Sequence, residues 1–297
     1  MFAHIDSGRL LLSIPNDIIS LLLSPTIIDS ISSRLRLTAA HILTNSSVMS
    51  KKSPRWQSAI NSALEKYEKS VVMQLASIDA TSPIPHVRSH IFRSFLDPRS
   101  NPALPLILTT TDVRSPKTAQ IIANPHVNIA WWIEGTQEQF RISGVASIIP
   151  SPQDPLYKQF IYSTTSSAVS SPNTGVAALS RENFDWEAKR KEVFKTMSAH
   201  MKASWCRPTP GSPLIGGQEE AKTWPERVDE PKDSDESDES EEEKKNRKNW
   251  DVALRNFALI LVDPTEVDYV ELGVFPNRRT LFNRSTQGIW KEQELVP

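Results

Sequence analysis

Short apolar segments separated by turn residues run through most of the chain after residue 70, and they restrict the folds that it can adopt. The segments occupy residues 70–79, 85–96, 104–112, 126–135, 138–150, 256–272 and 278–295. In segment 138–150, Phe140 and Ile142 alternate with Arg141 and Ser143, as in a strand with one buried face. Helical patterns are fewer, at 55–69, 116–124 and 182–204. We therefore predict a mainly β, α+β fold, an antiparallel barrel with appended helices, because the regular strand–helix alternation of a doubly wound sheet is missing.

Composition excludes several kinds of site. The chain has 9 Gly against 22 Pro, and neither common glycine-rich phosphate-binding pattern, G-x-G-x-x-G or G-x-x-x-x-G-K-[ST], occurs in it. Its single cysteine, Cys206, rules out an internal disulfide and a zinc site built on cysteines, and it fits a reducing compartment. No apolar run reaches the roughly 18 residues of a membrane-spanning helix. We expect a cytoplasmic protein with no membrane or nucleic-acid partner, and a nuclear or mitochondrial location stays open.

Charge is unevenly distributed, although 34 Lys and Arg against 35 Asp and Glu leave a net charge of only −1. Residues 229–243 hold ten acids and one base, so the rest of the chain has an excess of positive charge. Because this run has no aromatic or branched apolar residue to bury, we predict that 207–249 is a disordered acidic insertion. It is either a solvated linker or a segment phosphorylated at Ser240, which has Glu243 three residues further on.

The first 48 residues differ from the rest in being rich in Leu, Ile and Ser. A segment that reads as the beginning of a domain follows from Met49. We expect 1–48 to be a poorly ordered, optional extension, 49–206 to form the main part of the barrel, and 250–297 to supply the C-terminal strands that complete it.

Without a glycine-rich loop, a phosphate group has to be bound by side chains, best beside the start of a helix. The segment T-T-T-D-V-R-S-P-K at 109–117 places Thr110 and Thr111 at a strand end and Arg114, Ser115 and Lys117 where a helix begins. The alternative is that these are basic residues on a solvated face. The segment is therefore a candidate anion site.

Arg88 and Arg93 lie on the neighbouring predicted strand, 85–96. Five residues apart, they would lie on opposite faces of a flat strand, so only a bulge, a strand end or a second subunit could bring both to one ligand. His86 and His90 on the same strand could suggest a metal pair, but no third ligand is near them in the sequence, and we predict no metal.

Five motifs in order resemble a known family. They are R-S-H-I-F-R at 88–93, T-T-T-D-V-R-S-P-K at 109–117, A-N-P at 123–125, E-Q-F-R-I-S-G at 138–144 and R-R-T-L-F at 278–282. In this order they resemble the pyridoxamine 5′-phosphate oxidase-like FMN-binding split barrels, and P-T-P-G at 208–211 is similar to the branch with P-x-P-G after the middle helix. The resemblance covers about 54–212 and 250–297 and implies an antiparallel FMN-binding split β-barrel.

The resemblance also implies which residues contact FMN. They are Arg88, Ser89, Arg93, Thr110, Thr111, Arg114, Ser115, Lys117, Gln139 and Arg279. Arg93 stands where the family has lysine, and Pro116 replaces the arginine of the phosphate clamp, for which Arg114 could substitute. The residues that would bind the vitamin phosphate are missing from 156–180 and from P-N-R-R at 276–279. The residues that the family uses to bind FMN are therefore better matched in this chain than those that it uses to oxidise pyridoxamine phosphate.

Three functions follow from these patterns and stay open. The first is an FMN-dependent oxidoreductase acting on an unidentified small molecule, and the second is a flavin-binding protein without catalysis. The third is an interaction protein that uses its acidic insertion. The resemblance further implies a homodimer with flavin between the subunits, which would also bring Arg88 and Arg93 to one ligand.

Overall fold

The computed structural model describes residues 52–79, 81–165, 173–232 and 240–297. The predicted extension 1–48 lies outside these residues. Nine strands form one antiparallel sheet in the described part of the chain. They are β1 (Val72–Ile78), β2 (Pro85–Ile91), β3 (Ser94–Leu96), β4 (Leu106–Asp112), β5 (His126–Ile133), β6 (Glu138–Ile149), β7 (Phe257–Glu271), β8 (Arg278–Arg284) and β9 (Trp290–Leu295).

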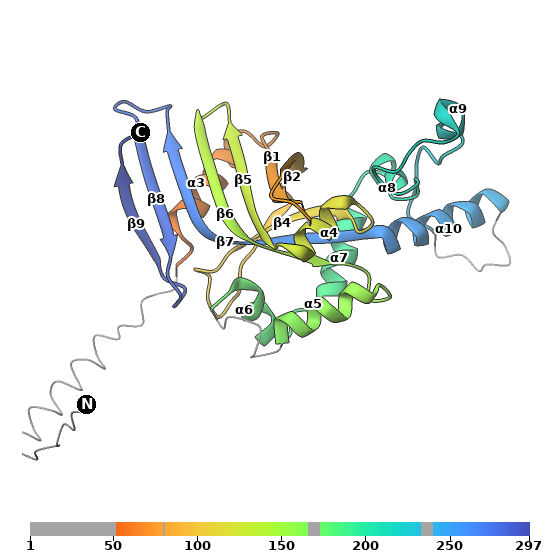
Figure 1. Ribbon diagram of the computed structural model, residues 1–297, viewed down its shortest axis with the longest axis horizontal. Coiled ribbons are helices and arrows are strands. Elements are labelled where there is room, and N and C mark those ends of the chain that lie inside the picture. Colours follow the sequence, from red (N-terminus) through yellow and green to blue (C-terminus); the bar gives the residue numbers. More distant parts are fainter. Residues whose placement is uncertain (1–51, 80, 166–172, 233–239) are drawn as a thin grey trace, which may run out of the picture. The chain divides into compact units, whose positions relative to one another are not determined.

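The strand order is β2-β1-β5-β6-β7-β4-β3, with β8 pairing with β7 and β9 pairing with β8. β7 runs along β6, and it pairs with β4 through 257–262 and with β8 through 266–271. A bulge at Ser143 and Gly144 bends β6 beside this change of partner. A Cβ on Gly144 would lie 2.6 Å from the Asp263 carbonyl oxygen, so only glycine fits there. The sheet thus curls into a half-barrel, as predicted (Figure 1).

The described helices cover the sheet or extend from it. They are α3 (Arg55–Lys66), α4 (Pro116–Ala123), α5 (Pro155–Thr165), α6 (Gly175–Arg181), α7 (Trp186–Lys195), α8 (Ala199–Ser204), α9 (Gly217–Ala221) and α10 (Glu241–Asn256). The predicted helices at 55–69 and 116–124 are confirmed, and 182–204 divides into α7 and α8. The sequence analysis did not predict α5 and α6.

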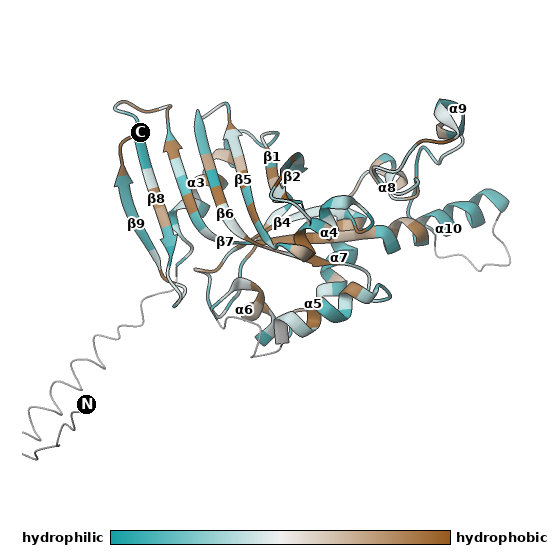
Figure 2. Ribbon diagram, in the orientation of Figure 1, coloured by the Kyte–Doolittle hydropathy of each residue, from teal (hydrophilic) through white to brown (hydrophobic). Residues whose placement is uncertain are grey.

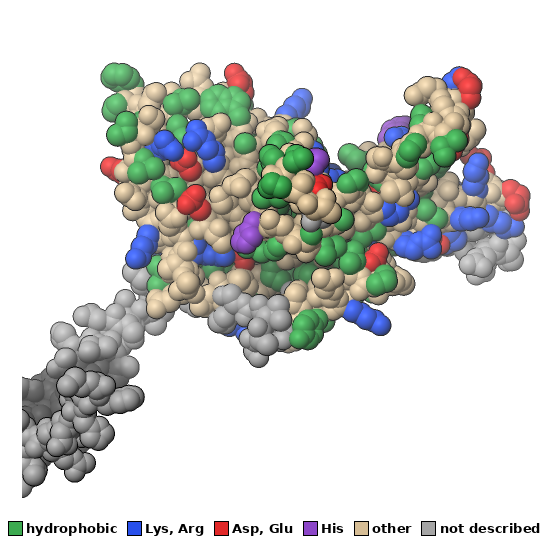
Figure 3. Space-filling model, in the orientation of Figure 1, with side chains coloured by type: hydrophobic (Ala, Val, Ile, Leu, Met, Phe, Trp, Pro, Cys, Tyr) green, Lys and Arg blue, Asp and Glu red, His purple; other side chains and the backbone are tan. Residues whose placement is uncertain are grey.

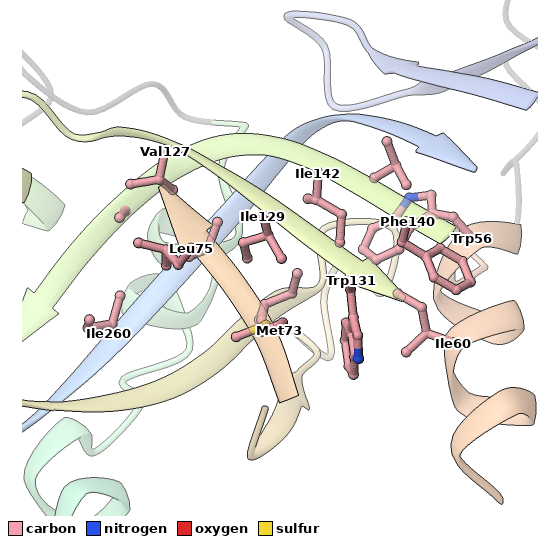
Figure 4. Packing of buried hydrophobic residues seen from close by; sticks show 14 of the residues in the cluster. Trp56, Ile60, Met73, Leu75, Val127, Ile129, Trp131, Phe140, Ile142 and Ile260 are labelled. Atoms are coloured by element: carbon pink, nitrogen blue, oxygen red, sulfur yellow. The ribbon is translucent and has the colours of Figure 1, made fainter. Parts of the chain in front are cut away.

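Two hydrophobic clusters stabilise this arrangement. The first fills the concave side of the sheet, where Trp56 and Ile60 of α3 pack with residues such as Met73, Trp131 and Phe140 (Figure 4). The second lies between the other face of β4 and β7 and helices α5 to α8 and α10. Neighbouring residues of β4 enter different clusters, Ile107 the first and Leu106 and Leu108 the second, which is why this strand is apolar on both faces.

The predicted disordered insertion 207–249 is wrong over much of its length. Residues 207–232 are described, with Val228 fully buried, and α10 begins directly after Ser240. The capping box between Ser240 and Glu243 satisfies backbone donors at the start of this helix, and Lys244 pairs with Glu241. The helix becomes apolar toward β7 (Figure 2), where Trp250 packs on Phe194 of α7 with ring centroids 4.9 Å apart. Amino-acid composition does not reveal such local capping and pairing, so this helix was not predicted.

A buried ion pair joins β7 to β8. Asp263 and Arg284 form it with side chains only 5% and 6% exposed, and Asp263 also accepts a hydrogen bond of 2.9 Å from the Gly175 amide at the start of α6. Burial raises the pKa of the Asp263 carboxyl, and the Arg284 charge opposes this shift. The charge of Arg284 therefore compensates for the burial of the Asp263 carboxylate, which without a partner would lower the stability of the fold.

Candidate functional site

A cavity of about 830 Å³ lies at the open edge of the half-barrel. One side is formed by the ends of β2 and β4 and the first turn of α4, and the other by α8 and the segment that follows it. In Figure 3 the surface is hollowed between the part that carries β2 and α4 and the part that carries α9. The lining residues that the sequence analysis had selected are Ser89, Arg93, Thr110, Thr111 and Lys117.

The turn between β4 and α4 supplies hydroxyls and an ammonium group to this cavity. The Lys117 Nζ donates to Thr111 Oγ1 at 3.1 Å, and Ser115 Oγ lies 3.2 Å from the same oxygen, behind the cavity wall. Pro116 begins α4, and Ser115 at its N-cap makes no side-chain capping bond. The positive end of the helix and the Lys117 charge thus lie on the same side of the cavity.

Arg88 and Arg93 reach this region because the predicted strand 85–96 is broken. β2 ends at Ile91 and β3 begins at Ser94, so Arg93 lies beyond the end of the strand that carries Arg88. Arg93 lines the cavity, whereas Arg88 pairs across the sheet with Leu75 and faces inward. Its guanidinium donates to Ser77 Oγ at 2.7 Å and to Gln120 Oε1 at 3.0 Å.

The ion pairs of the described residues do not include these three cations. Among the described residues, no carboxylate forms an ion pair with Arg88, Arg93 or Lys117. Burial lowers the pKa of all three, and the charge of Arg88 lowers that of Lys117 further, while the nearby Asp112 carboxylate opposes this shift at Lys117. The Arg93 Nε is also buried without a hydrogen-bond partner. An anion bound in the cavity would relieve both the repulsion and the missing bond.

The side chain of Arg114 does not line the cavity. Its guanidinium forms a two-bond ion pair with Asp112, at 3.0 and 2.7 Å, and donates to the carbonyls of Trp205 and Arg207. It therefore ties the end of β4 to the segment after α8, and it is not free to replace the arginine missing from the clamp.

Gln139 and Arg279 do not line the cavity. They belong to a polar cluster on β6, β7 and β8, in which Arg141 donates to Gln139 and both Arg141 and Arg279 pair with Asp268. The structure thus brings together seven of the ten predicted residues, if Arg88 and Ser115 behind the wall are included, and separates Arg114, Gln139 and Arg279 from them.

The remaining wall was missed by the sequence analysis. It comprises His90, Ile91 and Asp112 on the sheet side, and Met201, Ser204, Trp205, Arg207 to Ile215, Glu220 and Trp224 on the other. The P-T-P-G motif at 208–211 could have indicated the second group. Because 207–249 was predicted to be disordered, these residues were not considered as part of a site. His86 lies 3.6 Å from Asp79, and His90 lies 3.3 Å from Thr109.

The curled antiparallel sheet, with a cavity lined by cations and hydroxyl groups, places the protein among the half-barrel β proteins. Residues 53–150, which extend from α3 to β6, match the family model "Pyridoxamine 5′-phosphate oxidase, FMN-binding domain". The chain therefore carries a pyridoxamine 5′-phosphate oxidase-like FMN-binding domain, and the resemblance inferred from the motifs is confirmed.

A solved structure agrees with this assignment. A pyridoxamine 5′-phosphate oxidase-related, FMN-binding protein from Nostoc punctiforme is 25% identical with a TM-score of 0.57, and the match covers 82% of this chain and 98% of that one. PhzG from Burkholderia lata, in complex with tetrahydrophenazine-1-carboxylic acid, is 13% identical with a TM-score of 0.47, over 81% of this chain and 90% of that one. No sequence among the curated proteins matches the chain. Within the described residues, no helix has the length and apolar character needed to cross a membrane.

Proposed function

We propose that this protein binds FMN in the cavity, with the phosphate group beside Lys117, Arg93 and the Thr110–Thr111 hydroxyls. The observation that carries the proposal is a cavity of about 830 Å³ that is lined by Lys117, Arg93 and hydroxyl groups, with Arg88 behind its wall. None of these three cations forms an ion pair with a described carboxylate. A phosphate dianion is the kind of group that such a set favours, because charge-assisted bonds to it are stronger than neutral ones.

We further propose that the protein with FMN bound is an oxidoreductase that acts on a small molecule. The flavin supplies hydride transfer when bound. The chain's own contribution is to bind and orient it: cations and hydroxyls bind the phosphate, while Met201, Leu214, Ile215 and Trp224 form an apolar wall on the opposite side. The cavity lies within the usual size range of ligand sites, about 300–1,000 Å³.

A homodimer is part of this proposal. It is supported by Gln139 and Arg279, which the resemblance implies as flavin contacts but which lie outside the cavity of their own chain. In a dimer with flavin between the subunits, these two residues would act on the flavin held by the other chain. Light scattering on the flavin-loaded protein should then give twice the chain mass of 33.4 kDa.

Identifying the cofactor tests the proposed function directly. We expect the purified protein to be yellow or to become so with added FMN, and to release on denaturation a compound with the absorbance spectrum and mass of FMN. A colourless protein that does not bind added FMN would rule the proposal out. Turnover with NAD(P)H, or with pyridoxamine phosphate under oxygen, would separate an oxidoreductase from a flavin-binding protein without catalysis.

Deleting residues 233–239 should leave FMN affinity unchanged, because the described cavity wall ends at Trp224. The matched comparison is deletion of 226–247. That change removes buried Val228, whose amide bonds to Ala199 at the start of α8, and the Ser240 cap of α10. Since α8 contributes to the cavity, the longer deletion should lower both the thermal midpoint and FMN affinity. Equal FMN titrations for the two deletions would contradict this expectation.

A further inference from the structure

Arg114 does not line the cavity, yet its side chain bonds to both of the cavity's walls. On the sheet side, Asp112 fixes the guanidinium, since Arg114 Nε donates to Asp112 Oδ1 at 3.0 Å and Nη2 donates to Oδ2 at 2.7 Å. The same Nη2 donates to the carbonyl oxygens of Trp205 and Arg207, at 3.3 and 3.0 Å. Because Trp205 and Arg207 belong to the opposite wall, the guanidinium bridges the cavity at its base.

Trp205 reinforces this bridge from the other side. It ends α8, where the last carbonyls of a helix have no partner within the helix. Its own carbonyl accepts from Arg114 and from Asn256 Nδ2 at 2.8 Å, and its indole Nε1 donates to the Thr111 carbonyl at 3.2 Å. The end of α8 is therefore attached to β4 by bonds in both directions.

The wall that continues from Arg207 has only local hydrogen bonds. In the described part of the chain, the hydrogen bonds of residues 208–216 span no more than four positions along the sequence. Three of these residues are prolines, which lack an N–H donor. Leu214 and Ile215 in this segment line the cavity and are exposed. The bond from Arg114 to the Arg207 carbonyl thus attaches the beginning of this wall to the sheet side of the cavity.

We propose that Arg114 is a positioning residue of the flavin site, which holds the wall 208–215 in place opposite Lys117. This inference rests on the proposed FMN function. Arg114 is not a phosphate ligand in this arrangement, because its charge is compensated by Asp112 and its donors are occupied. The wall that it holds includes apolar side chains, so losing Arg114 affects contacts with the part of the flavin that does not carry the phosphate.

Comparing FMN with riboflavin, which lacks the phosphate, separates positioning from phosphate binding. The variant is Asp112→Asn/Arg114→Ala, which removes the guanidinium without leaving an unpaired carboxylate near Lys117. We expect it to weaken the binding of FMN and of riboflavin by the same factor, about 3- to 10-fold, as for the loss of a hydrogen bond. A loss confined to FMN would make Arg114 a phosphate ligand and overturn the proposal. Unchanged affinity for both ligands would also overturn it.

Two further variants complete the comparison. Arg227→Ala is the matched control, because Arg227 forms the same kind of two-bond pair with Asp229, at 2.7 and 2.6 Å, but does not line the cavity. It should alter neither affinity. Arg114→Lys keeps a charge beside Asp112 but lacks the planar fork that reaches a carboxylate and two carbonyls at once. It should weaken both ligands equally, and it tests the proposal even if the double variant does not fold.

Amide hydrogen exchange gives a readout that needs no flavin. In the FMN-free protein, the amides within 209–215 should exchange faster in the double variant and in Arg114→Lys than in the wild type, while those of β6 stay unchanged. Arg227→Ala should exchange like the wild type, and unchanged exchange at 209–215 in both Arg114 variants would refute the role. If the wild-type protein binds no FMN, the proposed function falls and this inference with it. FMN binding that does not depend on Arg114 removes only the inference.

Discussion

Replacing Lys117 by alanine is expected to weaken FMN binding about 10- to 150-fold, since losing a charge-assisted contact costs roughly 1.5–3 kcal/mol. Lys117 is the cation that lies with Thr111 in the cavity wall at the start of α4, and none of the carboxylates in the described part of the chain forms an ion pair with it. Fluorescence titration of FMN at constant ionic strength measures the effect. Riboflavin, which lacks the phosphate, should bind the variant and the wild-type protein equally.

Lys158→Ala is the matched control, because this exposed lysine of α5 lies outside the cavity. It should leave FMN affinity unchanged. Arg88→Ala should weaken FMN binding in the same direction as Lys117→Ala, with an added structural effect, since Arg88 bonds to Ser77 and Gln120. Unchanged affinity in both Lys117→Ala and Arg88→Ala would mean that the phosphate lies elsewhere.

Replacing Arg284 by methionine should lower the free energy of unfolding by about 3–5 kcal/mol at neutral pH. The variant leaves the carboxylate of Asp263 buried with only the Gly175 amide as a partner. Because burial already raises the pKa of this carboxyl, removing Arg284 should raise it further. A group with a raised folded-state pKa stabilises the fold relatively more at low pH, so the deficit should shrink as pH falls toward the unfolded value near 4.

Urea unfolding at several pH values measures this effect. The double variant Asp263→Asn/Arg284→Met is the control, since it removes both charges and keeps an acceptor for the Gly175 amide. It should recover most of the lost stability. A single variant as stable as the wild-type protein at pH 7, or a deficit that grows as the pH is lowered, would show that the pair does not act as described.

Much of the fold could be predicted from local patterns. The alternation in 138–150 and the apolar runs on either side of it correspond to β6 and its neighbours within a few residues. The break between β2 and β3 could not be predicted, because Ile91 and Ser94 belong to one apolar run and only their different partners, β1 and β4, divide it. The start of α10 was hidden for another reason: its first residues are all charged, and capping rather than hydrophobic periodicity defines where it begins.

In the candidate site, too, some contacts could be predicted from the sequence and others could not. Thr111 and Lys117 are close because they lie six residues apart across one strand–helix turn, and this proximity is visible in the sequence. Arg114 lies in the same turn, but its interaction with Asp112 and with the carbonyls after α8 depends on contacts more than 90 residues away.

Residue order alone was sufficient to predict an antiparallel β protein, a candidate phosphate-binding turn at 109–117 and a family resemblance, because strand periodicity, helix starts and motif spacing are properties of neighbouring residues. The cavity itself required the folded chain. Its walls come from β2, β4, α4, α8 and residues between 207 and 224, and two of the lining residues, Ser89 and Trp224, lie 135 positions apart in the chain. Such features arise from long-range packing, which places groups with unsatisfied charge or hydrogen-bonding capacity around a common space.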